Sequence, residues 1–167
     1  MILLQELKIS TPLGKMVAIG SEENLYLLQF TNGRHLEKEI NKLKMQAEIT
    51  PGEAMSLIKI RDELRLYFDG MLKSFNTPFQ LIGSDFQNKA WRALMSTPYA
   101  KTRSYREQAK LVGNEKAFRA VANANAANQL SIIVPCHRII NHNGKLGGYA
   151  AGIERKEWLL QHEKKYG

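Results

Sequence analysis

The single cysteine of this chain lies in the segment SIIVPCHRII, residues 131–140, directly after a proline and before a histidine. Cys136 is therefore the one thiol that can act as a nucleophile or accept a transferred group, and no internal disulfide can form. His137 is a residue type that can remove the thiol proton. Because the two residues are adjacent in sequence, a direct hydrogen bond between them is awkward, and we expect a bridging water.

Pro135 suggests how the chain could activate this thiol. Proline commonly occupies the first turn of a helix, where unpaired backbone N–H groups would point at the sulfur and favour the thiolate. On the residues alone a second interpretation stays open. Cys136 can be a small buried apolar side chain and His137 an interior histidine with a purely structural hydrogen bond.

A carboxylate that could orient the imidazole lies on the last expected helix, residues 152–167. Glu163 follows Leu159 by four residues and Leu160 by three, so it shares their apolar face and needs a buried partner. Asn128 is a further polar candidate near the site. The alternative for Glu163 is a frayed helix end with no catalytic role.

Two short helices precede the cysteine. In SYREQAKLVG, Ser104 and Glu107 form an expected capping box and Gly113 ends the helix, while Asn114 caps the next helix, EKAFRAVANANA. Two short helices joined by a tight turn that contains glycine indicate a helix-turn-helix. A structural hairpin without nucleic acid remains the alternative.

The second of these helices has an unusual composition. RAVANANAAN alternates alanine with asparagine, so its surface is small. Major-groove recognition helices present long side chains to base edges, whereas small residues allow close approach to the minor groove. Arg119 would then be the one long cation able to fill the gap left by a displaced base. Without such a partner, it is an ordinary surface arginine.

The charge distribution agrees with a polyanion as partner. The 167 residues carry a net charge of +8. Residues 1–82 hold ten basic and ten acidic side chains, whereas residues 83–167 hold fourteen and six. The composition, 44% hydrophobic and 24% charged, excludes disordered and fibrous classes. No apolar run is long enough for a membrane helix, and a cytoplasmic location is expected.

The sequence predicts a small α+β domain over residues 1–82 and a second domain over residues 83–167. The pattern predicts an antiparallel three-stranded meander, two helices and an additional strand. Their ranges are 3–10, 14–21 and 24–31 for the meander, 33–46 and 51–70 for the helices, and 74–82 for the additional strand.

Five segments in order, FQNKAWRALMSTPYAKTRSY, RAVANANAAN, IIVPCHRII, GGYA and RKEWLLQHE, resemble the signatures of the O6-alkylguanine-DNA alkyltransferases of the bacterial single-function type. These are also called methylated-DNA–protein-cysteine methyltransferases. The resemblance is close from Phe86 to Glu163 and faint before. It implies an α/β (α+β) fold, with an RNase H-like N-terminal antiparallel sheet and helices, and a mostly helical C-terminal domain with a helix-turn-helix.

The resemblance implies DNA repair by direct, irreversible transfer of an alkyl group from O6-alkylguanine to the thiolate of Cys136, with O4-alkylthymine as a further candidate. The damaged base would be flipped from the minor groove. The thioether product would end the protein's activity after one lesion. The expected partner is double-stranded DNA carrying alkylated bases, and we expect a monomer that needs neither cofactor nor metal.

Roles for matching residues follow from the same resemblance. Cys136 is the acceptor, His137 the base acting through water, and Glu163 the carboxylate that holds the histidine. Asn128 braces the acceptor turn. Tyr105 helps to rotate the nucleotide out and either protonates N3 of the departing guanine or donates a hydrogen bond to it.

The resemblance also implies a set of DNA and substrate contacts. Arg119 takes the place of the flipped base, and Tyr149 forms the aromatic wall of the alkyl pocket. The N–H of Ala150 faces the guanine oxygen, and the carbonyls of Cys136 and Ile139 read the exocyclic amine. Asn125, a further candidate for DNA contact, stands where some relatives have an apolar side chain, so its contact with the opposing strand is expected to differ.

Ala151 stands where many relatives have glycine or a bulky residue, so the accepted size of the alkyl group is open. A lesion-binding module without transfer would share the fold but lack Cys136. A cysteine hydrolase could use the same Cys, His and Glu, but would not need the basic helical pair. A sequence-specific transcription factor would need more base-reading side chains than the small-residue helix offers.

Overall fold

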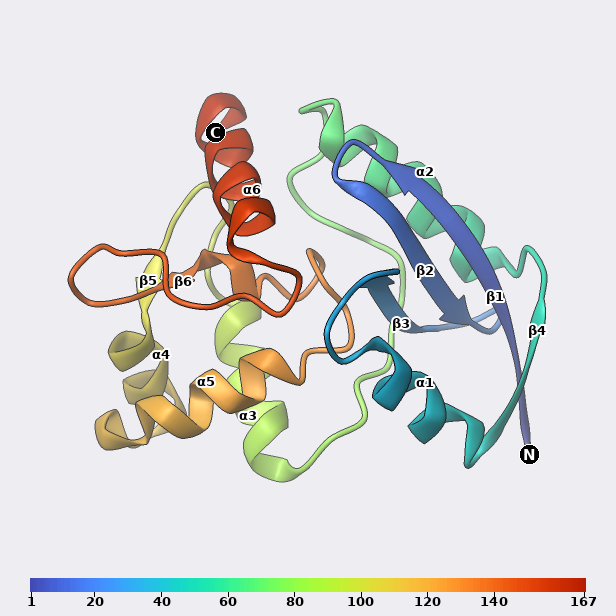
Figure 1. The fold of residues 1–167 in the computed structure, drawn as a ribbon, viewed down its shortest axis with the longest axis horizontal. Coiled ribbons are helices and arrows are strands. Elements are labelled where there is room, and N and C mark those ends of the chain that lie inside the picture. The colour runs from blue at the N-terminus through green and yellow to red at the C-terminus, as the bar shows by residue number, and fades with distance from the viewer. The chain divides into compact units, whose positions relative to one another are not determined.

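The structure, a computed structural model, describes residues 1–167 and divides into two compact units, Met1–Leu81 and Ile82–Gly167 (Figure 1). The division falls one residue before the expected domain boundary. All residues singled out for chemistry belong to the second unit. No helix in either unit has the length and apolar character needed to cross a membrane.

The first unit is built on a four-stranded sheet in the order β3-β2-β1-β4. The antiparallel meander is confirmed, with β1 at Ile2–Thr11, β2 at Gly14–Gly20 and β3 at Leu25–Phe30. The fourth strand, β4 at Ala47–Pro51, pairs parallel to β1 and was not expected. The sheet is therefore mixed rather than purely antiparallel. Pro51 ends this strand and does not begin the following helix.

Two helices accompany this sheet, α1 at Leu36–Lys44 and α2 at Met55–Phe68. The first is part of the crossover that a parallel β1–β4 pair requires. Apolar side chains of the sheet and α1 form a buried core that includes Leu4, Val17, Ile19, Leu27 and Leu43. The additional strand expected over residues 74–82 is wrong, because this segment makes only an isolated parallel bridge between Leu25 and Phe79.

The second unit is mostly helical, as expected. Its helices α3, α4 and α5 pack against one another around a core of small residues, and α6 follows near the C-terminus. The elements are α3 (Asp85–Met95), β5 (Arg103–Ser104), α4 (Tyr105–Val112), the 3₁₀ helix η1 (Glu115–Ala117), α5 (Phe118–Ala126), the 3₁₀ helix η2 (Cys136–Arg138), β6 (Ile139–Ile140) and α6 (Ile153–Tyr166).

The helix ends in this unit follow local capping rules. The predicted capping box is present, since the Ser104 hydroxyl accepts from the Glu107 N–H and the Glu107 carboxylate accepts from the Ser104 N–H. Gly113 ends α4 with a φ of 109°, in the left-handed region. Asn114 caps the next turn, which is 3₁₀ before α5 begins. These signals fix the tight α4–α5 connection.

Replacement of Gly113 by alanine tests this turn. Although the added methyl group has open space, it must adopt a positive φ, so Gly113→Ala should lower the free energy of unfolding by about 1 kcal/mol. Urea denaturation would measure this change. The exposed Lys110→Ala on the same helix is the control and should be nearly neutral. An unchanged stability of Gly113→Ala would show that the turn tolerates a different conformation.

Candidate functional site

A short parallel ladder between β5 and β6 brings the candidate residues of the second unit together. Arg103 pairs with Ile139 and Ser104 with Ile140. Tyr105 directly follows β5 at the start of α4, and the Cys136–Arg138 turn directly precedes β6. Two residue pairs thus place the first turn of α4 beside the cysteine-bearing turn, although more than thirty residues separate them in sequence.

Asn128 contacts the cysteine-bearing segment through its side-chain amide. Its amide nitrogen donates to the carbonyl of Val134 at 2.8 Å and lies 3.3 Å from the sulfur of Cys136. Its oxygen accepts from the N–H of Leu130 at 3.0 Å. One buried side chain therefore ties the segment before the turn to the sulfur. Cys136 is only 9% exposed.

The electrostatics of this sulfur differ from the prediction. Residues 136–138 form only one 3₁₀ turn, and the N–H of Cys136 already donates to Val134 at 2.8 Å, so no extended helix N-terminus faces the thiol. Burial raises the pKa of Cys136, while the Asn128 hydrogen bond and the Lys156 charge act in the opposite direction. The resting residue is therefore a thiol that needs a base.

The imidazole of His137 is positioned to be that base. Its Nε2 lies 2.7 Å from a carboxylate oxygen of Glu163, and both side chains are completely buried. Because a carboxylate accepts, the hydrogen resides on Nε2 and the lone pair on Nδ1. Nδ1 has no hydrogen-bond partner within the protein. Burial lowers the pKa of His137 despite the opposing effect of Glu163, so the ring is neutral at pH 7 and its Nδ1 can accept a proton.

Glu163 is the centre of a buried charge cluster. Besides His137, it accepts from Nε and Nη2 of Arg138 at 2.8 and 3.0 Å, and from the N–H of Ala100 at 3.2 Å. Burial would raise the pKa of Glu163, but the hydrogen bonds from His137 and Arg138, together with the charge of Arg138, outweigh it and hold this pKa well below its usual range. The inward orientation inferred from helical periodicity is present in the structure.

Arg138 and Lys156 belong to this site but were not predicted as part of it. Arg138 also donates to the carbonyl of Thr97 at 2.8 Å. Lys156 is fully buried, and its Nζ donates to the carbonyls of Ile139 at 2.5 Å and Gly148 at 3.0 Å. The only sequence signal for Arg138 is its place in PCHR. Lys156 shares the buried face of α6 with Leu159 and Glu163, which helical spacing could have shown.

Lys156 carries a charge without a carboxylate partner among its hydrogen bonds. Burial lowers its pKa to about 8, and Cys136 opposes this effect. Its Nζ also lies 5.7 Å from the ring centroid of Tyr105. A protonated Lys156 therefore ties β6 to the following glycine loop and places positive charge close to the acceptor thiol and the tyrosine.

Tyr105 and Tyr149 both keep their protons at neutral pH. Burial, followed by the charge of Cys136, raises the pKa of each phenol. The hydroxyl of Tyr105 points to the carbonyl of Gly148 at a long 3.5 Å, so it is loosely held. Gly147 has a φ of 71°, and a Cβ there would lie 3.0 Å from the Tyr105 ring. Glycine at this position lets the loop approach the phenol.

The remaining predicted contacts divide into exposed and buried groups. Arg119 is exposed on α5, and Tyr149 and Ala150 are partly exposed. Asn125 is instead buried between α4 and α5, where its amide and that of Gln108 exchange hydrogen bonds of 2.7 and 2.8 Å. The Asn125 side chain is therefore engaged within the helix pair and is not placed to contact a DNA strand.

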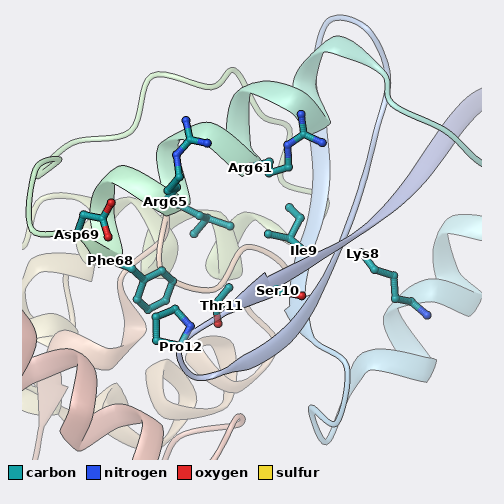
Figure 2. A pocket seen from close by; sticks show the side chains of 10 residues that line it. Lys8, Ile9, Ser10, Thr11, Pro12, Arg61, Arg65, Phe68 and Asp69 are labelled. Carbon is teal, nitrogen blue, oxygen red and sulfur yellow. The ribbon is translucent and has the colours of Figure 1, made fainter.

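A hollow of about 260 Å³ in the first unit is separate from this chemistry. It lies between the end of β1 with its turn and α2 (Figure 2). Phe68 and Pro12 contribute apolar surface, and Arg61 and Arg65 contribute charge, but no residue of the cysteine site lines it. No group of three or more histidine, cysteine or acidic side chains could hold a metal ion.

Comparisons with known proteins agree with this geometry. Residues 85–165 match the family described as 6-O-methylguanine DNA methyltransferase, DNA binding domain. A methylated-DNA–protein-cysteine methyltransferase of Methanosarcina acetivorans is 42% identical over 92% of this chain and 94% of its own length. A Shigella flexneri protein of the same name is 38% identical over 98% of this chain and 97% of its own.

Solved structures extend the match to the fold. A Mycobacterium tuberculosis OGT in complex with DNA has a TM-score of 0.84 at 36% identity, covering 99% of this chain and 95% of that one. Fold and site together thus define a DNA repair protein that transfers an alkyl group to a cysteine of its own. The chain belongs to the methylated-DNA–protein-cysteine methyltransferase family.

Loss of the Glu163 charge should lower the free energy of unfolding and weaken the dependence of that free energy on pH. Glu163→Gln leaves Arg138 buried without its anion, and we expect a loss of roughly 3 to 5 kcal/mol in unfolding free energy. The pKa of Glu163 is lower in the folded protein than in the unfolded chain. Its ionised carboxylate therefore contributes fully to the free energy of unfolding above about pH 5, and this contribution is lost as pH falls.

Denaturation between pH 3 and 7 would show this difference, with the exposed Glu157→Gln as the control. A Glu163→Gln protein with wild-type stability throughout that range would contradict the charge cluster.

The burial of Cys136 predicts a sluggish thiol in the absence of DNA. The rate of alkylation by iodoacetamide should rise with pH around a higher midpoint in the folded protein than in the urea-unfolded chain. Lys156→Met should move this midpoint further upward, because the nearby positive charge is lost. Mass spectrometry of Cys136 at successive pH values would follow the reaction. A folded midpoint below the unfolded one would instead indicate a thiolate stabilised at rest.

Proposed function

We propose that Cys136 is the acceptor sulfur of this alkyl-transfer protein and that His137 and Glu163 activate it. The observation that carries the proposal is the completely buried His137–Glu163 hydrogen bond of 2.7 Å, one residue from the only thiol. Glu163 fixes the tautomer in which Nδ1 is basic. Nδ1 then takes the thiol proton through a bridging water, and the resulting imidazolium is stabilised by the carboxylate.

The transfer itself is a displacement at carbon. The sulfur of Cys136 forms a bond to the alkyl carbon while the bond between that carbon and O6 of guanine breaks, and its electron pair stays with the base. Tyr105 donates its proton to N3 of the departing guanine, which the loose hydrogen bond to Gly148 permits. The proton lost from Cys136 is held by His137. Lys156 offsets negative charge on Tyr105.

The damaged base must leave the duplex before this step. We infer that α4 and α5 act as the helix-turn-helix that binds the minor groove, because the exposed residues in the later part of α5 are small. Arg119 occupies the place of the flipped nucleotide. Tyr149 lines the alkyl pocket, the N–H of Ala150 faces the guanine oxygen, and the second lone pair of the Ile139 carbonyl reads the exocyclic amine.

Each protein molecule should act once. A thioether is not hydrolysed under cellular conditions, and the sequence contains no second cysteine that could accept the group. Double-stranded DNA carrying alkylated guanine, and alkylated thymine as a second candidate, is the substrate.

Intact-protein mass spectrometry tests the proposal directly. After incubation with a duplex that bears one O6-methylguanine, the protein should gain one methyl group on the peptide containing Cys136. Cys136→Ala should gain none, and a second equivalent of duplex should add nothing to the spent protein. His137→Ala should slow transfer by about 10²-fold or more. Methylation at another residue, or repeated turnover, would overturn the proposal.

A further inference from the structure

The exposed face of α5 is uneven along its length. Beyond the first turn its exposed and half-exposed positions hold only small side chains, such as Ala122 and Asn123. Both long side chains, Phe118 and Arg119, are on the first turn. Since the function proposed above uses only Arg119, the exposed aromatic residue beside it has no assigned role.

Phe118 is not part of the core between the helices. The buried cluster there contains Ala90, Ala109, Val121 and Ala124, and Phe118 does not belong to it. Phe118 is 36% exposed, and the guanidinium carbon of Arg106 lies 5.9 Å from its ring centroid. Arg106 is itself exposed on the first turn of α4. We call these two residues the Arg106–Phe118 ledge.

The ledge lies to one side of Arg119. Successive residues of a helix differ by about 100° around its axis, so Phe118 points away from Arg119 and toward α4. It therefore cannot enter the same gap in the base stack. A flat apolar ring paired with a cation is suited to a nucleotide backbone, where a sugar offers apolar surface and a phosphate offers charge.

Nearby acidic groups do not block this surface. The carboxylate of Glu107 is engaged with the N–H of Ser104 within the capping box. Glu115 is exposed, but Lys116 directly follows it. The ledge therefore retains the charge of Arg106.

We propose that the Arg106–Phe118 ledge binds the sugar–phosphate backbone of DNA next to the opened base pair. Phe118 packs on a deoxyribose, and Arg106 pairs with the adjoining phosphate. The inference rests on the proposed function and adds a second anchor to it, distinct from Arg119. Its consequence is that the two ledge residues contribute to duplex binding in different ways, one apolar and one ionic.

Equilibrium binding to a duplex containing O6-methylguanine, measured at several salt concentrations, separates these contributions. In a Cys136→Ala background, Phe118→Ala should weaken binding about tenfold without a change in salt dependence. Arg106→Gln should weaken binding and reduce the slope of log K against log salt by about one. Leu111→Ala, an exposed apolar residue of α4, and Lys44→Gln in the first unit are controls and should bind like the parent.

Transfer from the free base O6-methylguanine, with Cys136 intact, provides the second readout. Phe118→Ala and Arg106→Gln should react with the free base at the wild-type rate, because the ledge acts only on the duplex. Phe118→Leu, which keeps apolar volume, should bind with intermediate affinity and serves if Phe118→Ala is unstable. Binding by both Phe118 variants within twofold of the parent, or an equal loss on the free base, would overturn the ledge. Failure of the unaltered protein to accept a methyl group from duplex would instead refute the proposed function.

Discussion

The buried carboxylate of Glu163 is the interaction on which the second unit depends. An ionised carboxylate without water is costly unless its oxygens are fully hydrogen-bonded. Here His137 and Arg138, both in the η2 turn, and the N–H of Ala100, in the loop after α3, supply the partners. All three lie far from α6 in the sequence. The same contacts that satisfy the anion therefore dock α6 and fix the imidazole. A substitution in this cluster should therefore change both the stability of the second unit and the orientation of the imidazole.

The proposed function requires a sulfur that is both buried and usable, and this arrangement meets both requirements. The thiol of Cys136 contacts Asn128, and burial raises its pKa, so it is protonated at neutral pH. Burial also keeps His137 neutral, so that its Nδ1 keeps a lone pair that can accept a proton. Lys156, tied to two carbonyls, supplies positive charge without forming an ion pair that would have to break. A protein that reacts once benefits from a thiol with low reactivity toward other electrophiles.

Local rules predicted much of the fold, whereas long-range pairing limited the rest. The Ser104–Glu107 box and the Gly113 turn depend on residues within a few positions, and both were predicted. Strand β4 was missed because it gains its stability from β1, more than forty residues earlier, and its terminal Pro51 resembles a helix start. Periodicity placed Glu163 inside correctly. Arg138 and Lys156 were missed because long cationic side chains are usually exposed, and only the assembled site reveals their partners.

The most direct test of the account is the protonation state of His137 in the DNA-free protein at neutral pH. Nitrogen-15 NMR of the labelled imidazole distinguishes the two neutral tautomers from the imidazolium. The structure predicts a neutral ring with its hydrogen on Nε2, facing Glu163, and an unprotonated Nδ1 without a partner in the protein, which is the state that the proposed proton transfer requires. A hydrogen on Nδ1 alone, or a doubly protonated ring, would contradict the assignment of His137 as the base that activates Cys136.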